Sequence, residues 1–156
     1  MTQVEKIEDA VVWHGRACSI LQVFRIISPA RLNLECFVQR LDARVNDRTR
    51  AAGLGLLRWH DGGLMLGPLC VLRLGALRQH PIAGFEAAAG RKVLGGLIAR
   101  EGGATLWYGA RREADNLIAA AGLSDFAPRL PRLPFSLVQS PLHRRIIRRA
   151  VISVAG

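Results

Sequence analysis

The sequence predicts an α/β or α+β protein with a β-rich first part, residues 1–80, and a short second part, residues 81–141, built from βαβ units with a parallel sheet. Two patterns predict this division: short apolar runs separated by glycine before residue 80, and alternating helix-like and strand-like segments after it. Half of the 156 residues are hydrophobic and only 22% are charged, which is typical of a folded chain. Residues 142–156 are expected to form a basic helical tail.

The first part contains three expected strands. Residues 32–41 begin with alternating apolar and polar side chains, which is typical of a half-buried strand. Two shorter strands are expected at residues 64–66 and 69–74, because Gly67-Pro68 interrupts the apolar run between them.

The second part is interpreted as helix, strand, helix, strand. Val93, Leu94, Leu97 and Ile98 recur at the spacing of one helical face, which predicts a helix within residues 85–100. The other expected elements are a strand at 104–108, a helix at 112–121 ended by Gly122, a proline-rich loop at 126–134 and a strand at 135–138.

The charge is strongly positive, with 22 basic and 12 acidic residues and a net charge of +10. Only Arg144, Arg145, Arg148 and Arg149 form a cluster, and they could bind nucleic acid or another polyanion. A non-enzymatic basic module that binds nucleic acid or a protein is therefore one candidate function. The other arginines are scattered, and biased coding composition explains them equally well.

The three cysteines, Cys18, Cys36 and Cys70, have no C-x-x-C spacing, and no signal peptide is recognisable. These features predict a cytoplasmic protein. Charged residues interrupt every long apolar stretch, so no transmembrane segment is expected. The four histidines share no metal-ligand spacing, and no metal site is expected.

Four short motifs follow one another along residues 25–141: Arg25-Ile26-Ile27-Ser28-Pro29, Gly67-Pro68, Pro81-Ile82-Ala83-Gly84 and Leu106-Trp107-Tyr108-Gly109-Ala110-Arg111. Their order and spacing resemble the ferredoxin-NADP reductase-like family of flavin-dependent reductases. The resemblance implies a partial antiparallel flavin-binding β-barrel followed by half of a nucleotide-binding domain. It also implies an oxidoreductase that passes hydride from NAD(P)H to FAD or FMN and then to an acidic electron-transfer protein.

The resemblance also implies roles for particular residues. Arg25 would bind the flavin phosphate, because a guanidinium forms two parallel hydrogen bonds to such a group. Ser28 would be the catalytic residue, with its hydroxyl at the edge of the isoalloxazine ring. Gly84 would let a pyrophosphate approach the backbone. The remaining cofactor-binding residues would be Tyr108, Gly109, Arg111, Arg112 and Ser140, of which Arg111, Arg112 and Ser140 would hold the adenosine end of NAD(P).

Departures from the family pattern leave a degenerate reductase scaffold open as well. Ile27 stands where the family has a tyrosine that stacks on the flavin, and Glu86 follows Gly84 where the family offers a second glycine. A further alternative is an acyl-CoA-dependent N-acetyltransferase, because Arg50-Ala51-Ala52-Gly53-Leu54-Gly55 resembles the R-x-x-G-x-G phosphate cradle of those enzymes.

Overall fold

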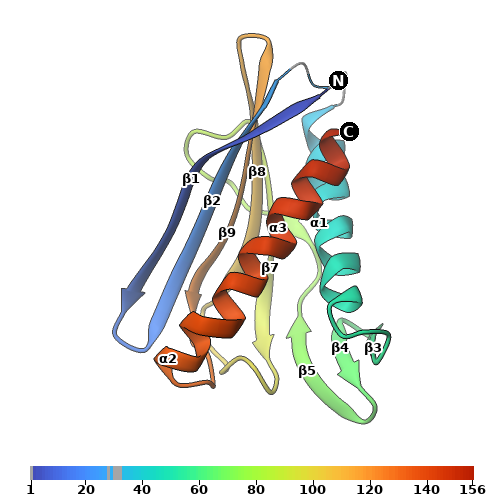
Figure 1. The fold of residues 1–156 in the computed structure, drawn as a ribbon, viewed down its shortest axis with the longest axis vertical. Helices are drawn as coiled ribbons and strands as arrows, with labels where there is room; N and C mark the ends of the chain where they lie inside the picture. The colour runs from blue at the N-terminus through green and yellow to red at the C-terminus, as the bar shows by residue number, and fades with distance from the viewer. Residues whose placement is uncertain (1, 28, 30–32) are drawn as a thin grey trace.

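One open antiparallel sheet carries the fold, and two long helices cover one of its faces (Figure 1). The computed structural model describes residues 2–27, 29 and 33–156. The strands follow the order β1-β2-β9-β8-β7-β5-β4-β3, with the short β6 paired to β7. The strands are β1 (Gln3–His14), β2 (Ala17–Ile27), β3 (Leu57–His60), β4 (Gly63–Leu66), β5 (Leu69–Leu74), β6 (Arg78–Gln79), β7 (Ala87–Gly95), β8 (Thr105–Glu113) and β9 (Asn116–Phe126). The helical segments are α1 (Leu34–Ala51), α2 (Arg132–Pro134), the π-helical η1 (Phe135–Gln139) and α3 (Ser140–Ala155).

The predicted parallel βαβ half-domain is wrong, because every pair of neighbouring strands is antiparallel. The predicted partial barrel is also wrong, since the sheet stays open with β1 at one edge and β3 at the other. Strands from both sides of residue 80 belong to this one sheet. Within it, β2, from the start of the chain, pairs with β9, from the second half.

Both helices predicted in the second part are strands. The segment expected to be helical at 85–100 contains β7, which pairs with β8 on one side and with β5 and β6 on the other. The helix expected at 112–121 is instead the end of β8, a tight turn and the first part of β9, and Ala114 in that turn has a φ of +53°. Pairing on both edges and burial on both faces of β9 outweigh a weak helical spacing in the sequence.

From Leu34 onward the segment expected to be a strand at 32–41 is the first half of α1, and residue 32 lies outside the described residues. Helix α1 begins after Asn33, whose side-chain oxygen accepts hydrogen bonds from the backbone N–H groups of Glu35 at 2.8 Å and Cys36 at 3.3 Å. The buried side of the helix then carries Phe37, Val38, Leu41 and Val45, the stripe of a helix that covers a core. The alternation before Cys36 ended too soon to define a strand.

The strand expected at 135–138 lies within η1 and is also wrong. Three prolines line the approach to α3, and each stands at or beside the start of a helical turn, where the missing N–H group has no partner to lose. The strands expected at 64–66, 69–74 and 104–108 are confirmed as β4, β5 and the start of β8, and the expected C-terminal helix is confirmed as α3.

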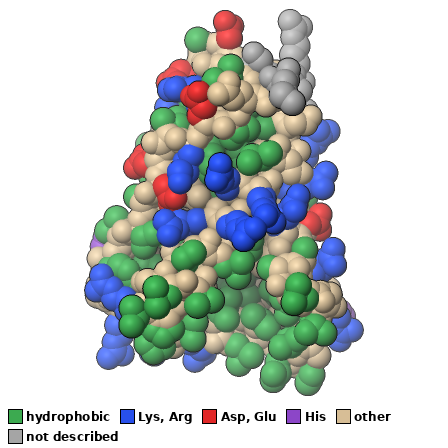
Figure 2. All heavy atoms as spheres, in the orientation of Figure 1, with side chains coloured by type: hydrophobic (Ala, Val, Ile, Leu, Met, Phe, Trp, Pro, Cys, Tyr) green, Lys and Arg blue, Asp and Glu red, His purple; other side chains and the backbone are tan. Residues whose placement is uncertain are grey.

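Lys and Arg side chains cross the middle of the helical face (Figure 2).

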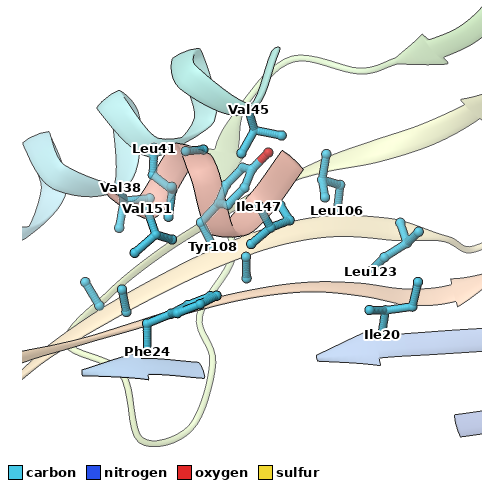
Figure 3. Packing of buried hydrophobic residues seen from close by; sticks show 14 of the residues in the cluster. Ile20, Phe24, Val38, Leu41, Val45, Leu106, Tyr108, Leu123, Ile147 and Val151 are labelled. Atoms are coloured by element: carbon cyan, nitrogen blue, oxygen red, sulfur yellow. The ribbon is translucent and has the colours of Figure 1, made fainter. Parts of the chain in front are cut away.

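The core lies between the sheet and the two helices (Figure 3). Tyr108 of β8 stands at its centre, fully buried, with its ring among side chains from α1 and α3. A buried ion pair fixes α1 to the sheet, because the Arg91 guanidinium of β7 donates to both Asp42 carboxylate oxygens, at 2.9 and 2.8 Å. Arg91 also donates to the Gly75 carbonyl at 3.0 Å. This geometry is the planar two-bond pairing that arginine forms best.

The other face of the sheet is covered at its centre by two aromatic side chains. Trp107 lies directly over Gly122, and its indole N–H donates to the Ser124 hydroxyl at 3.0 Å. Phe85 lies over Gly109 in the same way. Each glycine leaves room for a ring that any Cβ would displace, so these glycines serve packing.

Candidate functional site

An apolar cavity of about 130 Å³ lies between the helices and the sheet, at the end of the sheet where α1 ends and α3 begins. We call this the lower end, since it is at the bottom of Figure 1. The cavity walls come from α1, from β3, β5 and β7–β9, and from η1 and α3. Except for Asn46, Thr49, Gln139 and His143, all residues that line it are hydrophobic.

Two polar groups in the cavity wall are already bonded to the backbone. The Trp59 indole N–H donates to the Asn46 carbonyl at 3.0 Å, which holds β3 against the end of α1. The Thr49 hydroxyl donates to the Val45 carbonyl at 2.7 Å, within the same helix. These bonds satisfy both groups, and the side chains of Asn46, Gln139 and His143 supply the remaining polar character of the cavity.

The Gln139 side-chain oxygen is buried and accepts no hydrogen bond from any residue that the structure describes. A buried polar group without a partner costs about 1–3 kcal/mol of stability. Oxygen and nitrogen of a carboxamide are assigned from their neighbours, so either end of this group could be the one left without a partner. In both cases one polar end of the carboxamide, at the wall of an apolar cavity, is without a hydrogen-bond partner among the described residues.

His143 is the only histidine at this site and is uncharged at neutral pH. Burial and, to a smaller extent, the positive charge of the neighbouring Arg144 together lower its pKa from 6.5 to about 4. Arg144 turns to the other side of the helix, where its guanidinium lies 3.5 Å from the Asp9 carboxylate. Among the residues that the structure describes, none with a formal charge lines the cavity.

The residues expected to bind a flavin and a nicotinamide nucleotide do not form one site. Arg25 and Arg111 lie on the face of the sheet away from the helices, where Glu113 pairs with both, at 3.9 and 3.7 Å. Gly84 is close to them, since its carbonyl accepts a bond from Arg111 at 3.4 Å, and it has a φ of +87°. Gly109 lies under Phe85, whose ring Arg111 also covers at 5.5 Å.

The other expected residues lie elsewhere. Tyr108 points into the core on the opposite face, Ser140 is buried at the start of α3, and Arg112 is exposed near the end of β8. Ser28, the expected catalytic residue, lies outside the described residues. Flavin and nicotinamide binding stay predictions from the resemblance.

The glycines expected to form an acyl-CoA cradle also lie in a different setting. Gly53 and Gly55 follow the C-terminal end of α1 and lead into β3. The backbone at this end of a helix presents carbonyl oxygens, whereas a phosphate is bound by the N–H groups of a helix N-terminus.

The four arginines of α3 that were expected to bind a polyanion do not share one environment. Arg145, Arg148 and Arg149 are exposed, whereas Arg144 is half-buried and pairs with Asp9.

Sequence reasoning missed the cavity because its wall is assembled from distant segments. The only local signal was the pair Gln139 and His143, four residues apart and therefore on one side of a helix. Among residues 2–27, 29 and 33–156, no group of His, Cys, Asp or Glu side chains could hold a metal ion. Within the same residues, no helix has both the length and the apolar character needed to cross a bilayer. No family model, curated protein or solved structure matches this chain, so its function is argued from the cavity itself.

Proposed function

We propose that the protein binds a small uncharged molecule with an apolar body and one hydroxyl group, of about the size of phenol, in the cavity at the lower end. The unpaired carboxamide of Gln139, set in an apolar wall, is the observation that carries this proposal. A hydroxyl group can both donate and accept a hydrogen bond, so it matches either end of the carboxamide.

The volume of the cavity supports a ligand of this size. An apolar cavity of roughly 150 Å³ in another protein accommodates benzene. The present cavity, at about 130 Å³, therefore has room for one six-membered ring and little more. Aromatic and aliphatic side chains from five strands and two helices surround that space, as expected for a preformed binding site.

The electrostatics of the wall support an uncharged ligand. A charged group in this cavity would lose its hydration and find no opposite charge, because His143 is neutral and no other lining residue is ionisable. A phenol that keeps its proton meets no such penalty. The neutral imidazole adds one further donor and one further acceptor.

Binding of phenol, toluene and benzoate to the wild-type protein tests this proposal, with methyl and indole NMR shifts as the readout. The NMR shifts are expected to reach saturation with phenol and with toluene, and benzoate is expected to show no binding. The substitution Gln139→Leu removes the hydrogen bond and keeps the bulk of the side chain. It should lower the ratio of phenol affinity to toluene affinity about 3–10-fold, the value of one hydrogen bond.

The matched control is Gln3→Leu, on the exposed side of β1, which should leave that ratio unchanged. An unchanged ratio in Gln139→Leu would refute the assigned role of the carboxamide. Absence of saturation by both phenol and toluene would refute the function.

A further inference from the structure

A second hollow, of about 280 Å³, lies at the lower end and is lined by four arginines. They are Arg16 from the β1–β2 turn, Arg100 from the β7–β8 connection, and Arg129 and Arg132 from the segment before η1. Trp13, Gly15, Pro128, Leu130 and Pro131 also line it. We call it the arginine pocket. All four arginine side chains belong to exposed residues.

None of these arginines forms an ion pair with an acidic residue in the described part of the chain. Arg129 uses one N–H group to hold the carbonyls of Gly96 and Ala99, at 2.7 and 3.2 Å. Arg132 lies over the Trp13 ring at 4.8 Å. The remaining guanidinium donors are available to a ligand, and four positive charges around one hollow favour an anion with several oxygens.

The backbone around the arginine pocket is tied together. The Arg100 N–H donates to the Ala127 carbonyl at 2.8 Å, and the Arg129 N–H donates to the Ile98 carbonyl at 3.3 Å. Trp13 is held from behind by Phe135, with ring centres 5.4 Å apart. The arginine pocket is therefore built on fixed backbone, although its charged side chains extend from it.

Exposed apolar side chains lie at the arginine pocket and next to it in the chain: Leu130 lines the pocket and is 40% exposed, and Leu133 follows Arg132. In α2 and η1, Leu133 and Leu137 each expose 69% of their surface, and Val138 exposes 64%. A second apolar group near β3–β5 includes Leu54, which is 91% exposed. Figure 2 shows apolar side chains gathered at the lower end in these two places. Large exposed apolar patches mark surfaces that meet another apolar phase.

The segment that carries both part of the arginine pocket and these apolar side chains, residues 126–139, contains Arg129 and Arg132 and no acidic residue. Glu101 and Asp125 adjoin pocket-lining segments in the sequence, and neither lines the pocket. A partner at this end must offer both negative charge and an apolar interior.

We propose that the lower end docks on a bilayer containing anionic phospholipid, with a lipid phosphate in the arginine pocket and the side chains of Leu133, Leu137 and Val138 in the bilayer interface. A phospholipid surface supplies a phosphate and an apolar region next to each other. A free phosphate would use the arginines and leave the leucines in water, and a nucleic acid would do the same. This proposal does not depend on what occupies the apolar cavity.

Co-sedimentation with vesicles tests the proposal. Vesicles of equal parts phosphatidylcholine and phosphatidylglycerol are expected to bind the protein, with affinity that falls as salt is added, and pure phosphatidylcholine vesicles are expected to bind it weakly. The double variant Arg16→Gln/Arg100→Gln should lower the partition coefficient roughly 10–30-fold. Its control, Arg40→Gln/Arg44→Gln on the exposed side of α1, has the same net charge and should change the coefficient several-fold less.

A second pair of variants tests insertion. Leu133→Ser/Leu137→Ser should lower partitioning at least about 10-fold, whereas Ile7→Ser/Ile152→Ser, at sites 48% exposed on other surfaces, should not. Equal losses in the test and control variants of either pair would overturn the proposal. So would saturable binding of inorganic phosphate that quenches Trp13 fluorescence while the anionic vesicles fail to bind the protein.

Discussion

The buried pair of Asp42 and Arg91 predicts an unequal response to the loss of each partner. The Asp42 side chain is 5% exposed and the Arg91 side chain is 22% exposed. The substitution Arg91→Met leaves a carboxylate almost completely buried without a counter-charge, which should lower the free energy of unfolding by about 3–5 kcal/mol. The substitution Asp42→Leu leaves a guanidinium that reaches water and still donates to the Gly75 carbonyl, so the loss should be about 1–3 kcal/mol.

Urea unfolding of the wild-type protein, both single variants and the double variant Asp42→Leu/Arg91→Met measures these losses. The double variant should be more stable than Arg91→Met alone, because it holds no unpaired buried charge. Equal losses in the single variants, or a double variant that is the least stable of the set, would refute the reasoning from burial.

Three other predictions follow from the packing and from the shifted pKa values. Gly122→Ala should lower the free energy of unfolding by about 1–3 kcal/mol, because the new Cβ would overlap the Trp107 indole; Trp107→Leu in the same chain should recover part of it, as measured by urea unfolding. Tyr108 is the single tyrosine, and its burial raises its pKa well above 10; phenolate absorbance at 295 nm should appear only as the protein unfolds, and stability should fall as pH rises above about 10, where only the unfolded chain ionises. Because the pKa of His143 is lowered to about 4, the unfolded chain binds a proton before the folded chain does as pH falls from 6.5 to 4, and stability is lost in that range. In thermal melts, the fall in melting temperature from pH 7 to pH 5 should be smaller for His143→Gln than for the wild-type protein. The exposed-site control His14→Gln should show the same fall as the wild-type protein.

The sequence correctly predicted elements whose conformation depends mainly on residues close together in the chain. Gly67-Pro68 correctly separated β4 from β5, and the apolar spacing of the tail correctly predicted α3. The start of α1 is marked in the sequence by Asn33 followed by Glu35, a helix-start signal that the prediction of a strand at 32–41 missed.

The larger errors arose where tertiary pairing decides the conformation. Apolar residues recur at helical spacing in residues 85–100 and 112–121. These segments nevertheless form strands, because each pairs with a neighbouring strand on both sides. The wrong helix–strand order then suggested a parallel sheet. The sequence motifs could not reveal the cavity either, because Trp59, Leu106 and Gln139 converge only after the sheet and helices have assembled.

The pairing of β2 with β9 has a consequence for how the chain reaches its native state. Leu21 lies opposite Gly122, so these neighbours in the sheet are about a hundred positions apart in the chain. Contacts of such long range slow folding, because a large loop must close before they form. During synthesis, the β1–β2 hairpin would emerge early with one edge uncovered, and it would have to wait for nearly the whole chain before β9 arrives. The ribosome-bound nascent chain should therefore be the species of this protein that most needs a chaperone.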